Sequence, residues 1–158
     1  MKRVITGEKD GRSYFAHVGE VEAVASHGFV MRLAWGQDGL PMALPTTAET
    51  PEHDGQLFPP ADGVRMTHIV FLPDDEAAED EGGALDALMA EGDGMHQTET
   101  LDIGWVIEGE LGLELDDGSV QWLTAGDLIV QNGTRHKWRN RSGQPAVGGF
   151  VTLGAQRR

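Results

Sequence analysis

Residues 95–102 read Met-His-Gln-Thr-Glu-Thr-Leu-Asp, and residues 133–140 read Gly-Thr-Arg-His-Lys-Trp-Arg-Asn. Side chains alternate between the two faces of a β-strand, so residues two apart point the same way. An unbroken strand over the first stretch therefore places His96 and Asp102 on one face. The second stretch adds His136. Two imidazoles and a carboxylate that converge from neighbouring strands are suitable ligands for a metal ion.

Four further side chains are predicted to contact a substrate in the same pocket. Thr98 and Thr100 have the strand parity of the first histidine, so they face the same way. Trp138 shares the parity of the second histidine, and it fits either a flat wall for a substrate ring or core packing. Trp35 ends an apolar strand. It is predicted either to lie beside the pocket or to pack in the core or at an interface.

Alternating hydrophobicity predicts that the second half of the chain is β-structure. Leu111, Leu113 and Leu115 alternate with Gly112 and Glu114, which is typical of a half-buried strand. Asp-Asp-Gly-Ser at 116–119 predicts a hairpin turn, because Asp-Gly readily adopts positive φ angles. The expected strands are 103–108, 111–115, 120–124, 127–131, 136–140 and 146–153. Short strands with frequent turns indicate a sandwich or a barrel.

The first half is less regular. Its expected strands are 13–18, 20–25, 29–35 and 65–72. Residues 40–60 hold five of the seven prolines and predict a loop, and residues 84–91 favour one short helix by propensity. No repeat or linker divides the chain. We therefore expect one domain over 1–158, with N-terminal strands and loops in 1–92 and the two histidine stretches in 93–153.

Composition limits the classes of function. The formal net charge is -14, which opposes binding to nucleic acid or to an anionic membrane. There is no cysteine, no signal-peptide pattern near the start and no apolar run of the roughly 20 residues that span a bilayer. These features predict a cytoplasmic protein. The basic residues Arg135, Lys137 and Arg139 either balance nearby acidic groups or steer an anionic substrate.

The two histidine stretches resemble the motifs of the cupin superfamily of small β-barrels. Matches to the first motif are His96, Asp102 and Gly109, and matches to the second are Gly126, Gly133, His136 and Asn140. The second motif has one residue fewer than usual after its first glycine. The resemblance implies an all-β double-stranded β-helix, or jelly-roll barrel, here preceded by the expected short helix. It also implies a divalent metal ion held by three histidines and a glutamate.

The sequence departs from that ligand pattern. Thr98 replaces the second histidine, Asp102 replaces the glutamate, and Gln131 replaces a usual proline. Carried over position by position, the ligand set is His96, Asp102 and His136. Two histidines and one carboxylate suit Fe(II) and other divalent metals such as Mn, Ni or Zn. The alternative is a pocket without a metal, in which the carboxylate simply hydrogen-bonds to an imidazole.

The resemblance implies a metal-dependent enzyme that acts on a small oxygen-rich or aromatic carboxylate. Dioxygenase chemistry and isomerase, decarboxylase or lyase chemistry both fit, with Asp102 as the catalytic group that moves protons. The alternative function is a cupin that binds a small molecule without a metal and without catalysis. Many cupins pair through their outer sheets, so the resemblance also implies a homodimer, with Val4–Ile5 as an exchanged segment.

Overall fold

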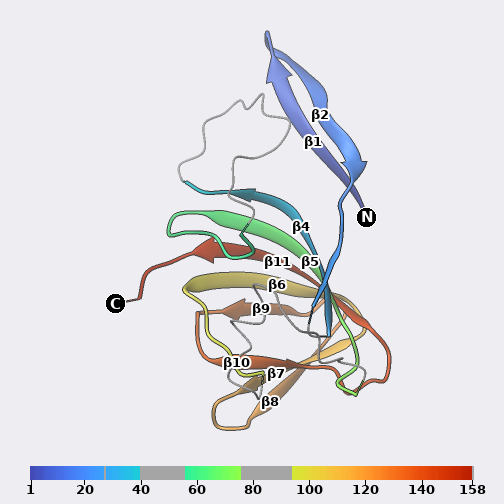
Figure 1. Cartoon of the computed structure of the whole chain (residues 1–158), viewed down its shortest axis with the longest axis vertical. Coiled ribbons are helices and arrows are strands. Elements are labelled where there is room, and N and C mark those ends of the chain that lie inside the picture. Colours follow the sequence, from blue (N-terminus) through green and yellow to red (C-terminus); the bar gives the residue numbers. More distant parts are fainter. Residues whose placement is uncertain (27, 40–55, 76–93, 158) are drawn as a thin grey trace.

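The computed structural model describes residues 1–26, 28–39, 56–75 and 94–157. Within these residues the chain forms β-strands and no helix, and Figure 1 shows their arrangement. The expected helix at 84–91 lies outside the described residues, and so does most of the expected loop at 40–60. No described segment forms a helix that is long and apolar enough to cross a membrane.

The first half contributes five strands. They are β1 (Lys2–Lys9), β2 (Arg12–Glu20), β3 (Val24–Ser26), β4 (Phe29–Gln37) and β5 (Val64–Phe71). The strands expected at 29–35 and 65–72 are confirmed, whereas the one expected at 20–25 is reduced to β3. Strand β1 was missed because few of its side chains are buried. Its signal was the turn at Asp10-Gly11, where both residues have the positive φ that a tight hairpin needs.

The second half contributes six strands. They are β6 (Thr100–Glu108), β7 (Glu110–Leu115), β8 (Val120–Thr124), β9 (Leu128–Gln131), β10 (His136–Arg139) and β11 (Ala146–Gly154). All six were predicted within three residues at each end. The hairpin turn at 116–119 is confirmed, with Gly118 at a φ of 75°. The alternating pattern was a reliable guide here because each strand buries one face.

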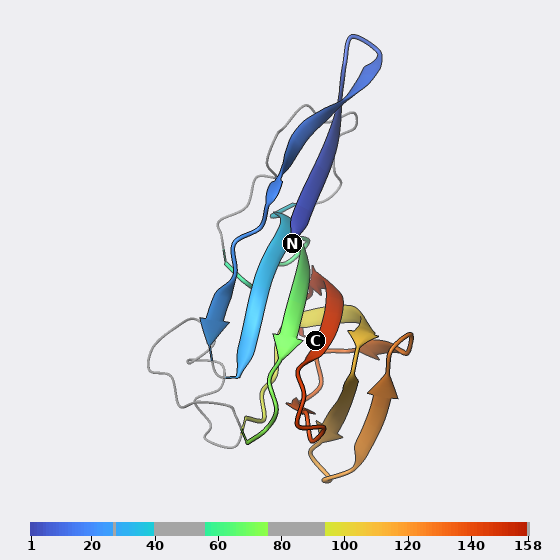
Figure 2. The ribbon, with the colours of Figure 1, turned by 90° about the vertical axis from the view of Figure 1, so that its right-hand side faces the viewer.

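The strands form three antiparallel sheets. A six-stranded sheet has the order β3-β4-β5-β11-β6-β9, a three-stranded sheet has the order β10-β7-β8, and β1 pairs with β2. The core joins the two larger sheets, since it contains Phe71 and Phe150 from one and Leu111 from the other. Figures 1 and 2 show the smaller sheet beside one end of the larger one, and the β1–β2 hairpin extending away from both.

A buried arginine fixes the segment that leads into β5. Arg65 is fully buried, and its Nη2 lies 2.6 Å from Oδ1 of Asp38. Its Nε donates to the carbonyl oxygen of Gln56 at 2.9 Å, and Nη1 donates to that of Gln37 at 3.2 Å. A buried guanidinium needs such partners, because an unpaired charge in the interior is costly. These bonds hold residues 56–58 against the end of β4.

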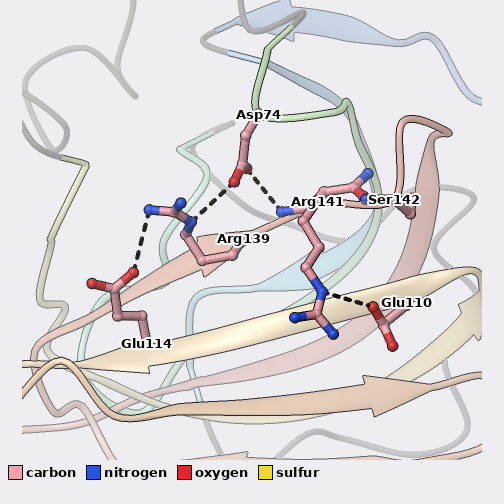
Figure 3. Close-up of polar contacts among 7 residues, drawn as sticks. Asp74, Glu110, Glu114, Arg139, Arg141 and Ser142 are labelled. Carbon is pink, nitrogen blue, oxygen red and sulfur yellow. Dashed lines mark hydrogen bonds and ion pairs between the residues drawn. The ribbon is translucent and has the colours of Figure 1, made fainter.

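The basic residues near β10 balance local acidic groups. Arg139 lies 3.0 Å from Asp74 and 3.3 Å from Glu114 (Figure 3). Arg135 lies 3.1 Å from Asp116. Both arginines are partly exposed, so each ion pair contributes about 1 kcal/mol or less. Of the two interpretations of this basic stretch, the structure supports charge balance for Arg135 and Arg139.

Candidate functional site

The two histidine stretches lie side by side and meet at the histidines themselves. The backbone amide of His96 donates to the carbonyl oxygen of His136 at 2.9 Å, and the reverse bond is also 2.9 Å. Their ring centroids are 4.3 Å apart. Strand β6 begins only at Thr100, so the expected unbroken strand over 95–102 is wrong in detail. The alternation of buried and exposed side chains from His96 to Thr100 nevertheless holds.

A glycine and an arginine hold the two stretches together. Gly133 has a φ of 61°, and a Cβ there would lie 2.8 Å from the carbonyl oxygen of Thr100 and 3.0 Å from that of Thr98. Only glycine allows this approach. Nη2 of Arg157 donates to the carbonyl oxygens of Gly133 at 2.7 Å and Thr98 at 3.1 Å. Arg157 therefore links the backbones of the two histidine stretches through these hydrogen bonds.

Backbone carbonyls orient both imidazoles. Nδ1 of His96 lies 3.2 Å from the carbonyl oxygen of Gly94, and Nδ1 of His136 lies 2.9 Å from that of Thr134. A carbonyl oxygen only accepts, so each Nδ1 carries the proton. Each Nε2 is then an unprotonated nitrogen without a hydrogen-bond partner among the described residues. This is the orientation that lets Nε2 accept a proton or bind a metal ion.

Burial keeps the two rings neutral. The pKa of His96 is lowered from 6.5 to about 4. Burial is the largest contribution to this shift, and the nearby charge of His136 is the next. Burial also lowers the pKa of His136. Because an imidazole loses its proton above its pKa, both rings are uncharged near neutral pH.

Asp102 is the one acidic side chain at this site among the described residues. Burial raises its pKa, while hydrogen bonds from the hydroxyls of Thr100 and Thr152 oppose that effect. Its Oδ1 is buried and has no hydrogen-bond partner among the described residues. A buried acceptor without a hydrogen bond costs free energy unless a ligand donates a hydrogen bond to it or the carboxylate binds a proton.

These groups lie at one end of a cavity of about 70 Å³. Its polar end contains His96, Thr98, Asp102, His136 and Thr152. Its apolar wall contains Phe29, Met31, Leu57, Phe58, Ile69, Phe71, Trp138 and Phe150. The described lining has no Lys or Arg, and residues 40–55 and 76–93 contain neither residue type. The cavity thus combines a negative or neutral polar end with an aromatic wall.

The structure brings together most of the predicted site residues. His96, Thr98, Asp102, His136 and Trp138 line the cavity as expected. Thr100 does not line it, and instead its hydroxyl lies 2.7 Å from that of Thr98. Thr100 therefore supports the polar end from behind.

Trp35 lies elsewhere. It faces the outer side of the six-stranded sheet, where it lines a second cavity. The pairing of β4 with β5 is irregular between Leu33 and Trp35. A bulge of this kind adds one residue and reverses the side-chain parity beyond it. Simple alternation from Phe29 and Met31 would have pointed Trp35 inward, so its expected place beside the pocket is wrong.

Sequence reasoning missed several lining residues from strands far away in the chain. Thr152 stands opposite Asp102 in the pairing of β11 with β6, and Phe150 stands opposite Gly104. The alternation of β11 placed both on one face, but no local signal tied that face to the histidines. The register of β11 against β6 places Thr152 and Phe150 in the same cavity as the histidines.

The predicted metal ligands His96, Asp102 and His136 all line this cavity, and their binding of a metal ion stays a prediction. Among the described residues, no group of three or more His, Cys, Asp or Glu side chains could hold a metal ion. The two imidazoles present free Nε2 atoms to one cavity, and Asp102 lines that cavity too. The unpartnered Oδ1 of Asp102 is a further acceptor in the same cavity.

No protein-family model matches the chain. The phomopsin biosynthesis cluster protein C' of Diaporthe leptostromiformis is 52% identical over 64 residues, which is 39% of this chain and 33% of that protein. The cupin-domain-containing oxidoreductase virC of Hypocrea virens is 42% identical over 55 residues, 35% of this chain and 28% of that protein. The chain spans about a third of the length of these curated relatives.

A solved cupin 2 conserved barrel domain protein from Salinispora arenicola has a TM-score of 0.48 and 15% identity, and the match covers 85% of this chain and 82% of that one. The described fold packs a six-stranded antiparallel sheet against a three-stranded one, and the histidine pocket is lined by residues of both. Local identity to proteins named for a cupin domain adds to the two motifs. The chain is thus similar to cupin-domain proteins over about a third of its length.

Proposed function

We propose that this cupin is an enzyme that transfers protons on a small uncharged molecule with a carbonyl or hydroxyl group and an apolar body. The observation that carries the proposal is the pair of neutral imidazoles, each with Nδ1–H bound to a backbone carbonyl and Nε2 left without a partner among the described residues. A neutral imidazole held in this way is a general base at neutral pH.

The chemistry of the lining favours a neutral substrate over a carboxylate. No lysine or arginine lines the described cavity, so its described lining offers no positive charge to an anion. The aromatic wall, which includes Phe71, Trp138 and Phe150, offers apolar contact to the rest of the molecule. The relatives named as cupin-domain-containing oxidoreductases support an enzyme of this superfamily rather than a storage protein.

One reaction fits these groups without a further reactant. Nε2 of His136 takes a proton from the carbon next to the substrate carbonyl. The electron pair of the broken C–H bond forms a C=C bond, and the π pair of the C=O bond moves to the oxygen. The carboxyl group of Asp102, whose pKa burial raises, gives its proton to that oxygen. The product is an enol, and return of a proton to the same carbon completes an exchange of hydrogen with solvent. In an α-hydroxy ketone the product is an enediol, and return of a proton to the former carbonyl carbon, with loss of the neighbouring hydroxyl proton, completes an isomerisation.

The test is exchange of substrate hydrogen with solvent. Cyclopentanone, a small ketone, and phenylacetone, an aromatic one, are incubated with the protein in D2O, and loss of the α-proton signal is followed by NMR. We expect exchange above the buffer rate, reduced about 100-fold or more in His136→Gln and in Asp102→Asn. His17→Gln, which removes a histidine outside the cavity, is the matched control. Exchange at the buffer rate for both ketones, or equal rates in all variants, contradicts the proposal.

A second candidate is a metal-dependent enzyme at the same residues. Two observations among the described residues favour it, namely the unpartnered Nε2 atoms and the unpartnered Oδ1 of Asp102. Bound Fe, Mn, Ni or Zn would supply Lewis-acid or redox chemistry there. The same exchange assay is repeated after EDTA treatment and after addition of Fe(II) or Mn(II). Activity that requires the added metal, with metal content lost in His96→Gln, replaces the first candidate with the second.

A further inference from the structure

A second and larger cavity lies on the opposite side of the six-stranded sheet. Its volume is about 570 Å³, within the usual range for small-molecule sites. It is bounded by β1 and by the outer faces of β4, β5 and β6. Figures 1 and 2 show the β1–β2 hairpin meeting the sheet near the N-terminus. This site is separate from the histidine cavity, because successive side chains of β5 such as His68 and Ile69 line opposite sides.

The lining of this second cavity is positively charged in a strongly acidic protein. Lys2 and Arg3 line it, and none of its described lining residues is Asp or Glu. The chain as a whole has a formal net charge of -14. A basic concave surface on such a background selects anions, since it attracts them while the acidic surface elsewhere repels them.

Three buried nitrogen atoms without partners in the described part of the chain lie at this cavity or on the residue paired with its lining. Nε of Arg3 is buried and has no hydrogen-bond partner among the described residues, and the same is true of Nε of Arg32 and Nδ1 of His68. Arg32 stands directly opposite His68 in the pairing of β4 with β5. The pKa of His68 is lowered, mainly by burial and next by the charge of Arg32. Buried polar nitrogens are normally hydrogen-bonded, so within the residues that the structure describes the two arginine Nε–H groups lack an acceptor and Nδ1 of His68 lacks a partner. The other nitrogens of Arg3 lie 3.2 Å from the carbonyl oxygen of Ala34 and 3.5 Å from Nε2 of His17.

Flat apolar surface completes the cavity. Trp35 and Trp105 line it together with Met66 and Ile107. Met66 and Ile107 are 44% and 47% exposed, so these side chains remain accessible. Tryptophan faces bind flat apolar rings, and a guanidinium binds a carboxylate through hydrogen bonds that are strengthened by charge.

We propose that this cavity binds a small aromatic carboxylate, with the anion at Arg3 and His68 and the ring against Trp35 and Trp105. The charge of Arg32 adds to the attraction. The proposal does not rest on the reaction assigned to the histidine cavity. It gives the N-terminal hairpin a role, because Arg3 reaches this site only when β1 lies over the sheet.

Calorimetric titration tests the proposal with 2-naphthoate as the probe and 2-naphthylmethanol as its uncharged counterpart. We expect saturable binding of naphthoate and at least tenfold weaker binding of the alcohol. Arg3→Gln should weaken naphthoate binding by about tenfold or more, the usual effect of losing one charged hydrogen bond. Arg3→Lys keeps the charge and should lose less. Arg12→Gln, an exposed arginine on the same hairpin, should leave binding unchanged.

Two further variants make the result decisive. His136→Gln alters only the first cavity, so naphthoate binding that survives it belongs to the second. Trp35→Ala should weaken binding of naphthoate, and thermal unfolding of each variant checks that it is folded. The proposal is overturned if the wild-type protein does not bind naphthoate saturably. Equal affinity for the acid and the alcohol, or unchanged binding in both Arg3→Gln and Trp35→Ala, also overturns it.

Discussion

His96 and His136 hydrogen-bond to each other through both of their backbone amide and carbonyl groups, at 2.9 Å in each direction. The pairing fixes the two imidazoles with their centroids 4.3 Å apart. Side chains on a directly opposed pair of residues lie on the same face of the sheet. One backbone contact therefore places two rings, which come from distant positions in the chain, at the same end of one cavity.

The first prediction concerns stability against pH. The pKa of His96 is about 4 in the folded protein against an ordinary value of 6.5, so the unfolded chain binds a proton first as the pH falls. The contribution of His96 to stability is full above pH 6.5 and is lost as the pH falls towards 4, by about 3 kcal/mol. Urea unfolding at several pH values measures this loss. We expect His96→Gln to flatten the curve and Thr98→Val, which removes no titratable group, to keep it.

The second prediction concerns Gly133. Gly133→Ala forces a Cβ to within 2.8 Å of a backbone oxygen, so we expect a loss of about 2 kcal/mol or more and a disturbed histidine site. Gly143 is the matched control, since its φ of 67° is similar but nothing among the described residues lies within 4 Å of the added Cβ. Gly143→Ala should cost about 1 kcal/mol. Equal losses of unfolding free energy in the two variants would show that the close approach does not matter.

The third prediction concerns Asp102. Burial raises its pKa, so the folded state binds the proton more tightly than the unfolded state does. Its contribution to stability is present at low pH and is lost as the pH rises through the raised pKa. Asp102→Asn should therefore gain stability relative to wild type at pH 8 and gain less at pH 4. Chemical unfolding at both pH values checks this. A loss of stability of the same size at both would contradict it.

The fourth prediction concerns Arg65. Arg65→Met leaves Asp38 and several backbone carbonyls without their buried donor, so we expect a loss of about 3 kcal/mol. The change should also loosen Leu57, which lines the histidine cavity. Arg141→Met is the control, because that arginine is 60% exposed in its ion pair with Glu110 (Figure 3). Its cost should stay within about 1 kcal/mol.

The fifth prediction is a homodimer, as the family resemblance implies, but with a contact at the edge of the large sheet in place of an exchange of Val4–Ile5. Strand β9 is an edge strand of the large sheet, and its Leu128 and Val130 are 72% and 58% exposed. A second copy that covers this edge would bury both side chains. Sedimentation velocity should then show a dimer, with affinity lowered about tenfold or more by Leu128→Asp. Gln121→Asp, on the small sheet, should have no effect, and a monomer at all concentrations would refute the prediction.

The amino-acid sequence by itself determined the class of fold and half of the site. Period-two alternation and Asp-Gly turns specified the strands of the second half, because each of those strands buries one face. The spacing of His96, Thr98, Asp102, His136 and Trp138 placed them in one pocket. These are local properties, and local properties are what a single sequence reveals.

Only the tertiary structure decided the rest. The bulge in β4 turned Trp35 outward, and the register of β11 brought Thr152 and Phe150 to the pocket. The hairpin over the outer sheet face assembled a second, basic cavity around Arg3. Each of these depends on pairing between strands distant in the chain, and a shift of one residue in such pairing reverses every side chain. The alternation within one strand does not contain that information.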